Sequence, residues 1–167
     1  MDIAALSAIF RNIASILEIK GQNVFRIRAY EKAAESIEGL PNTLETLIKE
    51  DRLTEIPGIG KDLSDKIKEF YATGKIQTYE ELKKTTPQGL LELLNIPSVG
   101  PKTARLLYEK LKINNIAELE KAISKNKITG IPGIKEKTLQ NISKGIDIVK
   151  RGRLRMTIEQ ANIFNET

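Results

Sequence analysis

Three short Pro/Gly turns carry the residues whose types and spacing point to a binding chemistry. The sequence IPGIG at 56–60 recurs as IPSVG at 96–100 and, in a degraded form, as IPGIK at 131–135. Each copy precedes a stretch with helical character: KDLSDKIKEF, PKTARLLYEKL and EKTLQNISKGI. Glycine lets the backbone adopt positive φ and approach another molecule closely. Because the first amides of a helix have no intrahelical acceptor, each turn predicts a site where amides bind a phosphate oxygen.

We expect the phosphate contacts to come from the turns and the residues just after them. Such contacts fix position on a nucleic-acid backbone and read no base sequence. The alternative is that each turn only joins two helices, with Gly and Pro as stop signals. In the third copy Lys135 replaces the second glycine, so this copy either contacts phosphate through the lysine side chain or only packs. The expected contact residues are Gly58, Ile59, Gly60, Lys61, Ser98, Val99, Gly100, Lys102, Thr103, Gly133 and Lys135.

Hydrophobic spacing predicts the helices that position these turns. Apolar residues recur at helical spacing over 3–18, and a second helix over 23–37 carries Phe25, Ala29, Ala33 and Ile37 on one side. Because no alternating run of β-branched residues extends beyond a few positions, the predicted fold class is all-α, with compact helical bundles. Further helix starts are expected at 42–45, 78–81 and 115–118, and the expected divisions of the chain are 1–84, 85–155 and 156–167.

The composition narrows the function classes. The chain has 167 residues, a formal charge of +5 and a pI of about 9.3, and it contains neither Cys nor His. The absence of Cys and His excludes disulfides, the usual zinc sites, cysteine nucleophiles and Ser-His-Asp catalysis. The basic excess favours a polyanionic partner. The start has no basic leader region and no apolar run long enough to span a bilayer, so we expect a cytoplasmic monomer without a membrane partner.

The turn pattern, apolar-Pro-Gly-apolar-Gly followed by a helix, resembles the helix-hairpin-helix motif. A longer ordered set resembles the amino-terminal half of family X DNA polymerases, closest to their bacterial and archaeal branch, over residues 3–155. This set is FRIRAYEKAAESIEGLP, then LTEIPGIGKDLSDKIKEFYATGK, then LLELLNIPSVGPKTARLLYEKL. The resemblance implies a first region that binds the 5′-phosphate side of a gapped or nicked DNA duplex. It also implies a second region that holds the duplex beside the primer end, in gap filling or base excision.

In that family polymerisation belongs to a later palm domain with metal-binding aspartates, and RGRLRMTIEQANIF at 151–164 resembles the lead into it. No Asp-x-Asp pair on a strand occurs in this sequence, so we expect a fragment that binds divalent metal only if a palm follows. The resemblance also implies a monovalent cation, Na⁺ or K⁺, held by backbone carbonyls of the turns. These carbonyls would belong to Thr54, Ile56, Ile59, Leu94, Ile96 and Val99.

Two further interpretations depend on the resemblance. Arg26, Arg28 and Lys32 are either a solvated basic helix face or a 5′-phosphate pocket, with Tyr30 as hydrogen-bond donor or stacking platform. Lys66 matches the Schiff-base lysine with which eukaryotic members remove a 5′-deoxyribose phosphate. That chemistry needs a neutral amine.

This chain departs from the family pattern at one pocket position. Asp62 stands where the pattern has a second lysine, four residues before Lys66. A carboxylate there favours the charged ammonium, and the alternative is an exposed i,i+4 ion pair.

The basic sequence KRGRLR at 150–155 either contacts the DNA backbone or serves as a charged hinge. Three functions therefore stay open: a DNA-binding module of a repair polymerase, a Lys66 lyase, and a protein-interaction module.

Overall fold

The computed structural model describes the backbone of residues 1–165 and the side chains of residues 1–155. Within these residues the chain is helical and contains no strand, which confirms the predicted all-α class. The chain divides into two compact units, Met1–Thr86 and Pro87–Thr167. The expected tail, 156–167, lies entirely outside the residues whose side chains are described. No helix of the described chain is long and apolar enough to cross a bilayer.

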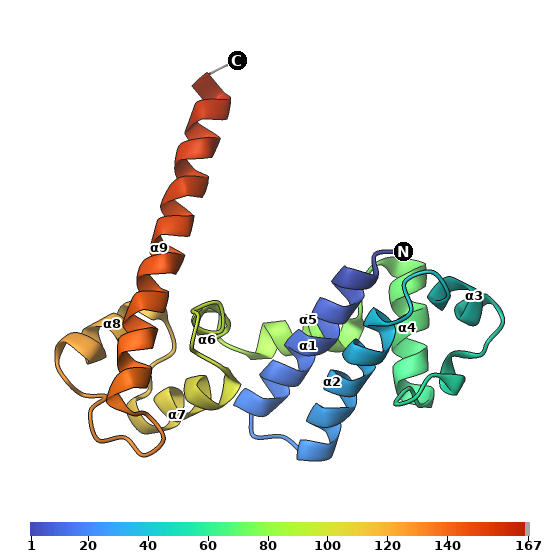
Figure 1. Ribbon diagram of the computed structural model, residues 1–167, viewed down its shortest axis with the longest axis horizontal. Coiled ribbons are helices and arrows are strands. Elements are labelled where there is room, and N and C mark those ends of the chain that lie inside the picture. The colour runs from blue at the N-terminus through green and yellow to red at the C-terminus, as the bar shows by residue number, and fades with distance from the viewer. Residues whose placement is uncertain (166–167) are drawn as a thin grey trace. The chain divides into compact units, whose positions relative to one another are not determined.

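The first unit is built on a pair of long helices. Helices α1 and α2 lie side by side (Figure 1), and they coincide closely with the helices predicted over 3–18 and 23–37. A turn at Gly21, with φ of 69°, separates them, as its glycine indicated. The elements of this unit are α1 (Ile3–Ile19), α2 (Val24–Glu38), α3 (Leu44–Lys49), the 3₁₀ helix η1 (Leu53–Glu55), α4 (Lys61–Thr73) and α5 (Gln77–Thr85).

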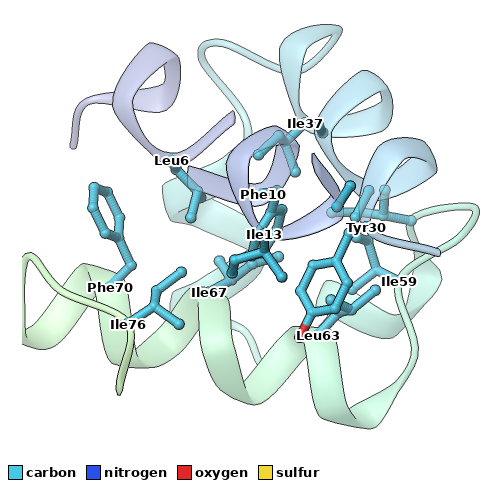
Figure 2. Close-up of a cluster of buried hydrophobic side chains, with 14 of the residues drawn as sticks. Leu6, Phe10, Ile13, Tyr30, Ile37, Ile59, Leu63, Ile67, Phe70 and Ile76 are labelled. Carbon is cyan, nitrogen blue, oxygen red and sulfur yellow. The ribbon is translucent and has the colours of Figure 1, made fainter. Parts of the chain in front are cut away.

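Apolar side chains from α1, α2 and α4 form the core of this unit (Figure 2). Phe10 and Tyr30 meet edge to face, with ring centroids 5.7 Å apart. The predicted buried side of α2 was wrong at its start, because Phe25 is 79% exposed while Ile27 is buried. The two residues lie about 160° apart around a helix of 3.6 residues per turn. The buried face of α2 therefore leaves Phe25 in solvent.

The predicted helix starts had mixed outcomes. Asn115 Oδ1 accepts a hydrogen bond from the Glu118 amide at 2.8 Å, so the start at 115–118 is confirmed. Helices also start near 42–45 and 78–81, but Asn42 and Thr78 are not their N-caps. Helix α3 follows Thr43 without a side-chain cap, and Glu45 instead accepts from the amino-terminal ammonium at 2.7 Å. Helix α5 begins one residue earlier than expected, because Glu69 of α4 accepts from the Gln77 amide at 2.6 Å.

The second unit surrounds another apolar core, to which Leu93, Leu107, Leu119 and Ile142 contribute fully buried side chains. Its last helix is the longest of the described chain. The elements of this unit are α6 (Gln88–Leu93), α7 (Pro101–Leu111), α8 (Ile116–Ser124) and α9 (Glu136–Asn165).

The basic sequence at 150–155 lies inside α9, so the expectation of a hinge there is wrong. Lys150 Nζ lies 2.6 Å from Glu120 of α8, and Arg153 lies 3.3 Å from Glu92 of α6. Because these two cations pair with carboxylates of the same unit, less of this basic segment is available to another molecule than its sequence suggested.

Gly145 of α9 lets the second turn pack directly on that helix. A Cβ atom at this position would lie 2.4 Å from the carbonyl oxygen of Pro97 and 2.8 Å from Cγ2 of Ile96. Both distances are shorter than van der Waals contact allows. The missing side chain therefore fixes how closely α9 supports the turn.

We expect Gly145→Ala to lower the free energy of unfolding by about 1–3 kcal/mol, since the added methyl group overpacks the contact with Pro97. Gly152 of the same helix is the matched control, because a Cβ there meets nothing within 4 Å. Gly152→Ala should raise stability by about 0.5–1 kcal/mol through helix propensity. Chemical denaturation of both variants checks this, and equal effects of the two changes would contradict the contact.

Candidate nucleic-acid interface

The three Pro/Gly turns share one backbone geometry. The residue after each proline has positive φ: 87° at Gly58, 78° at Ser98 and 93° at Gly133. In each turn an amide donates back to a carbonyl three residues earlier, from Ile59 to Ile56, Val99 to Ile96 and Ile134 to Ile131, at 3.0 to 3.1 Å. Proline followed by a residue of positive φ is the arrangement of a type II turn. The sequence repeat is therefore also a structural repeat.

Apolar side chains anchor the turns in the two cores. Ile56, Ile59, Ile96 and Val99 are each at most 5% exposed. Burying a side chain of this size stabilises a fold by about 1.5–3 kcal/mol. In the first unit, Ser36 of α2 adds a further attachment, because its hydroxyl donates to the Pro57 carbonyl at 2.8 Å. The turns are therefore rigidly held from inside while their other side faces solvent.

The helices that follow the first two turns begin with unpaired amides. Gly60 and Gly100 are the N-caps of α4 and α7, and neither helix has a side-chain cap. Among the described residues, the amides of Gly60, Lys61, Gly100 and Lys102 donate no hydrogen bond within the protein, and all four residues are exposed. Pro101 has no amide to donate. Each turn therefore presents free donors at the positive end of a helix dipole.

Neither backbone angles nor packing within the protein require glycine at positions 60 and 100. Their φ values are −88° and −91°, which any residue adopts. A Cβ atom at either position would meet no protein atom within 4 Å. Gly58 differs, because its φ is positive and a Cβ there would lie 2.7 Å from Cγ of Lys32. The open space in front of Gly60 and Gly100 suits the close approach of another molecule.

The third turn has the backbone of the other two with different side chains. The Lys135 carbonyl accepts from the Leu139 amide at 3.0 Å, as Gly60 and Gly100 accept from the fourth residue after them. Lys135 is exposed and Ile134 is buried. The first helical residue is Glu136, whose negative charge stands where the first turn has Lys61. The positive potential of this turn is therefore weaker.

Helix α2 carries three basic side chains, one of which, Lys32, lies beside the first turn. Arg26, Arg28 and Lys32 are exposed, and none of them pairs with a carboxylate in the described part of the chain. The stem of Lys32 lies against Gly58. Phe25, which sequence reasoning assigned to the core, adds an exposed aromatic ring at the start of this helix. The cations of α2 and the free amides of α4 thus belong to the same unit.

Tyr30 does not have the exposed position that a stacking platform requires. Its side chain is 2% exposed and packs against Phe10, and Figure 2 shows it among apolar residues. Its hydroxyl is buried and has no hydrogen-bond partner in the described residues. The expectation that the ring is a stacking platform is therefore wrong, because the face of α2 that carries Tyr30 packs into the core. A donor role for its hydroxyl stays a prediction.

Lys66 is held as an ammonium by its neighbours. Burial lowers its pKa, but the hydrogen bond from Lys66 Nζ to Asp62 at 2.7 Å and the nearby Tyr30 raise it more, so the pKa lies above its usual value. The Tyr30 hydroxyl forms no hydrogen bond in the described residues, so it raises the pKa of Lys66 only by lying close to the ammonium group. The i,i+4 pair expected from the sequence is present, with Asp62 79% exposed as expected but the Lys66 side chain only 13% exposed. A raised pKa disfavours the neutral amine that a Schiff base needs.

We expect Asp62→Asn to lower the pKa of Lys66, because burial then opposes the charge without the carboxylate. Since the folded-state pKa is raised, the interaction stabilises the native chain at neutral pH and is lost as pH rises through that pKa. Reductive methylation followed by peptide mass spectrometry across pH measures the shift. Asp51→Asn is the control, because Asp51 pairs with Lys68 at 2.5 Å instead. An unchanged Lys66 profile in Asp62→Asn would refute the coupling.

Several carbonyls of the first two turns are able to accept a cation. Ile56 and Ile96 each accept one amide, which leaves a second lone pair on each oxygen. The carbonyls of Thr54, Ile59, Leu94 and Val99 accept no hydrogen bond among the described residues. No cluster of acidic side chains that could hold a metal occurs in the same residues. A monovalent cation bound by these oxygens stays a prediction.

Comparison with known proteins assigns the chain to a family. Residues 1–76 match the profile described as helix-hairpin-helix domain, and residues 90–147 match the SAM-like helix-hairpin-helix tandem. DNA polymerase/3′-5′ exonuclease PolX of Bacillus subtilis is 33% identical over 138 residues, which are 83% of this chain and 24% of that protein. The chain belongs with the amino-terminal region of family X DNA polymerases.

A plant relative agrees with this assignment. DNA polymerase lambda of Arabidopsis thaliana is 34% identical over 106 residues, 63% of this chain and 19% of that protein. The chain thus spans about a quarter or less of the length of these family X relatives. The tandem match includes both the second and the third turn, so the third turn belongs to the helix-hairpin-helix region despite its lysine.

Proposed function

We propose that this chain binds DNA without sequence preference, as the DNA-binding part of a family X polymerase that acts in gap filling or base excision. The observation that carries the proposal is the pair of glycine N-caps, Gly60 and Gly100, with free amides and nothing in front of them. A phosphate oxygen is the acceptor that suits such amides at a helix N-terminus. The contacts are made to the backbone, so they are independent of base sequence.

Charge supports the same ligand. Lys61 and Lys102 are exposed, and the backbone amide of each belongs to one set of free donors. Neither pairs with a carboxylate in the described residues. Each cation that neutralises a phosphate releases a counterion, which makes binding depend on salt with a log-log slope of about −0.9 per contact. A protein partner at the same surface would give a flat salt response, which separates this alternative.

The basic face of α2 gives the first unit a preferred DNA structure. Arg26, Arg28 and Lys32 supply three exposed, unpaired charges on α2, enough to bind a terminal phosphate that carries more charge than an internal one. The ligand we propose is a gapped or nicked duplex with a 5′-phosphate. A monovalent cation at the turn carbonyls would add positive charge between the protein and the phosphate.

The structure of the same unit supports lyase activity less well than DNA binding. The hydrogen bond between Lys66 and Asp62 keeps the amine charged, and the chain carries no observation that favours Schiff-base formation. We therefore assign the first unit to binding. Polymerisation by the longer relatives needs residues that this sequence does not contain, because no Asp-x-Asp pair is present.

Gly60→Ala and Gly100→Ala should each weaken binding to gapped DNA by about tenfold, because a charge-assisted hydrogen bond contributes about 1.5–3 kcal/mol. The added methyl group meets no protein atom, so thermal stability should stay unchanged. Fluorescence anisotropy with a labelled gapped duplex measures the affinity.

Gly152→Ala is the matched control, since its methyl group is equally free and lies seven residues along α9 beyond Gly145, where that helix contacts the second turn. Retention of full affinity by both turn variants would remove the proposed mechanism. The mechanism also requires that the variants stay folded. A turn variant that loses its helicity in circular dichroism together with its affinity would therefore contradict it.

A gap with a 5′-phosphate should bind more tightly than the same gap with a 5′-hydroxyl, by about fivefold at low salt, since exposed charge pairs each contribute up to about 1 kcal/mol. Arg26→Ala/Arg28→Ala should abolish this difference while leaving the affinity for the hydroxyl gap nearly unchanged. Competition binding between the two DNAs measures it. Equal affinities in the unsubstituted protein would show that α2 does not read the terminal phosphate.

A further inference from the structure

A second basic surface lies in the unit Pro87–Thr167, at the end of α7 opposite the second turn. Four lysines, Lys112, Lys121, Lys125 and Lys127, line a pocket of about 320 Å³ between the ends of α7 and α8. We call these four residues the lysine pocket. Its apolar lining includes Leu111, Ile113 and Ala122, and the one acidic residue in the lining is Glu118.

The charges of the lysine pocket are not compensated within the protein. In the part of the chain whose side chains are described, none of the four ammonium groups pairs with a carboxylate. Glu118 faces the pocket, but its carboxylate accepts from the Asn114 amide at 3.0 Å. The other nearby acid, Glu120, pairs with Lys150. Several like charges at one pocket repel one another, and an anion relieves that repulsion.

Helix ends account for part of this charge but not for all of it. Lys112 and Lys125 are the C-caps of α7 and α8, where a helix dipole of about −0.5 charge favours a cation. Two such ends and one carboxylate offset about two of the four positive charges. About two of the four positive charges therefore remain uncompensated, and the stabilisation of the helix ends does not account for them.

An exposed aromatic ring borders the lysine pocket. Tyr108 is 38% exposed, and Lys112 Nζ lies 5.7 Å from the centre of its ring. Cations beside an exposed aromatic ring suit a single nucleic-acid strand, because the bases stack on the ring while the phosphates meet the cations. A duplex keeps its bases stacked on one another and cannot use the ring in this way. The combination favours a single strand over a duplex.

From the Tyr108 ring and the lysine pocket together, we propose a site for single-stranded DNA on the second unit. Helix α7 separates this site from the second turn, since Gly100 precedes the helix and Lys112 ends it, about 18 Å apart at 1.5 Å per residue. The site is chemically independent of the glycine N-caps. Its failure would therefore leave the proposed duplex contacts standing, and their failure would leave this site standing.

The first test uses the double variant Lys121→Ala/Lys125→Ala of the full chain, with oligothymidylate as the ligand. Single-strand affinity should fall at least fivefold, and the log-log salt slope should lose about 1.4, at about 0.7 per single-strand contact. Affinity for a blunt duplex should change less than twofold. The melting temperature should change little, because the relief of repulsion between the lysines offsets the loss of their interaction with the C-terminal end of the α8 dipole.

The matched control is Lys75→Ala/Lys84→Ala, which removes the same charge from two exposed, unpaired lysines of the first unit. This control should keep its affinity for oligothymidylate. Unchanged single-strand binding in the pocket variant would overturn the proposal. An equal loss in the pocket variant and the control would also overturn it, because the effect would then be one of net charge.

The second test examines the ring. Tyr108→Ala should weaken oligothymidylate binding by about fivefold or more, since base stacking on one aromatic ring contributes about 1–3 kcal/mol. Tyr108→Phe should bind normally. The chain has no Trp, so Tyr108→Trp introduces a single reporter whose fluorescence oligothymidylate should quench. Normal binding by Tyr108→Ala, or an unquenched Trp, would overturn the proposed stacking.

Discussion

One backbone constraint underlies both units: a turn with positive φ after proline, closed by an amide that donates three residues back. This closure uses the amide of the last apolar residue of the turn and leaves the following amides without a partner. The next helix cannot satisfy them either, because its first donors lack a preceding turn of helix. The free donors are thus a geometric consequence of starting a helix straight after this turn. Because these donors are exposed, a phosphate oxygen can reach them.

The two units hold the same turn by different means. In the first unit the Ser36 hydroxyl binds the Pro57 carbonyl, whereas in the second unit Gly145 lets α9 approach the Pro97 carbonyl without a side chain between them. Both arrangements bring a neighbouring helix against the proline carbonyl. Apolar anchors on either side of each turn fix its depth in the core. A rigid turn keeps its amides aimed without further loss of conformational entropy on binding.

Ion pairing decides which basic residues remain available. Lys150 and Arg153 looked equivalent to the other cations in the sequence, but each has a carboxylate partner in the folded chain, as Lys66 has in Asp62. The cations of α2 and of the lysine pocket have none in the described residues. Pairing reduces the potential that a phosphate meets and, for Lys66, also stabilises the charged amine. Binding surfaces and internal supports are therefore distinguished by partners, not by residue type.

The sequence by itself determined the helical class, the bounds of α1 and α2 within a residue or two, the repeated turns and the glycines at the helix starts. These features follow from local rules, since periodicity, positive φ and helix ends act over a few neighbouring residues. Tertiary structure alone decided that Tyr30 is buried and Phe25 exposed, because that depends on which face of α2 packs on α1. It also brought together lysines from the ends of α7 and α8, and it paired Lys150 with Glu120, 30 residues away. Contacts between distant segments arise only when a shared core sets their positions, and no local pattern encodes them.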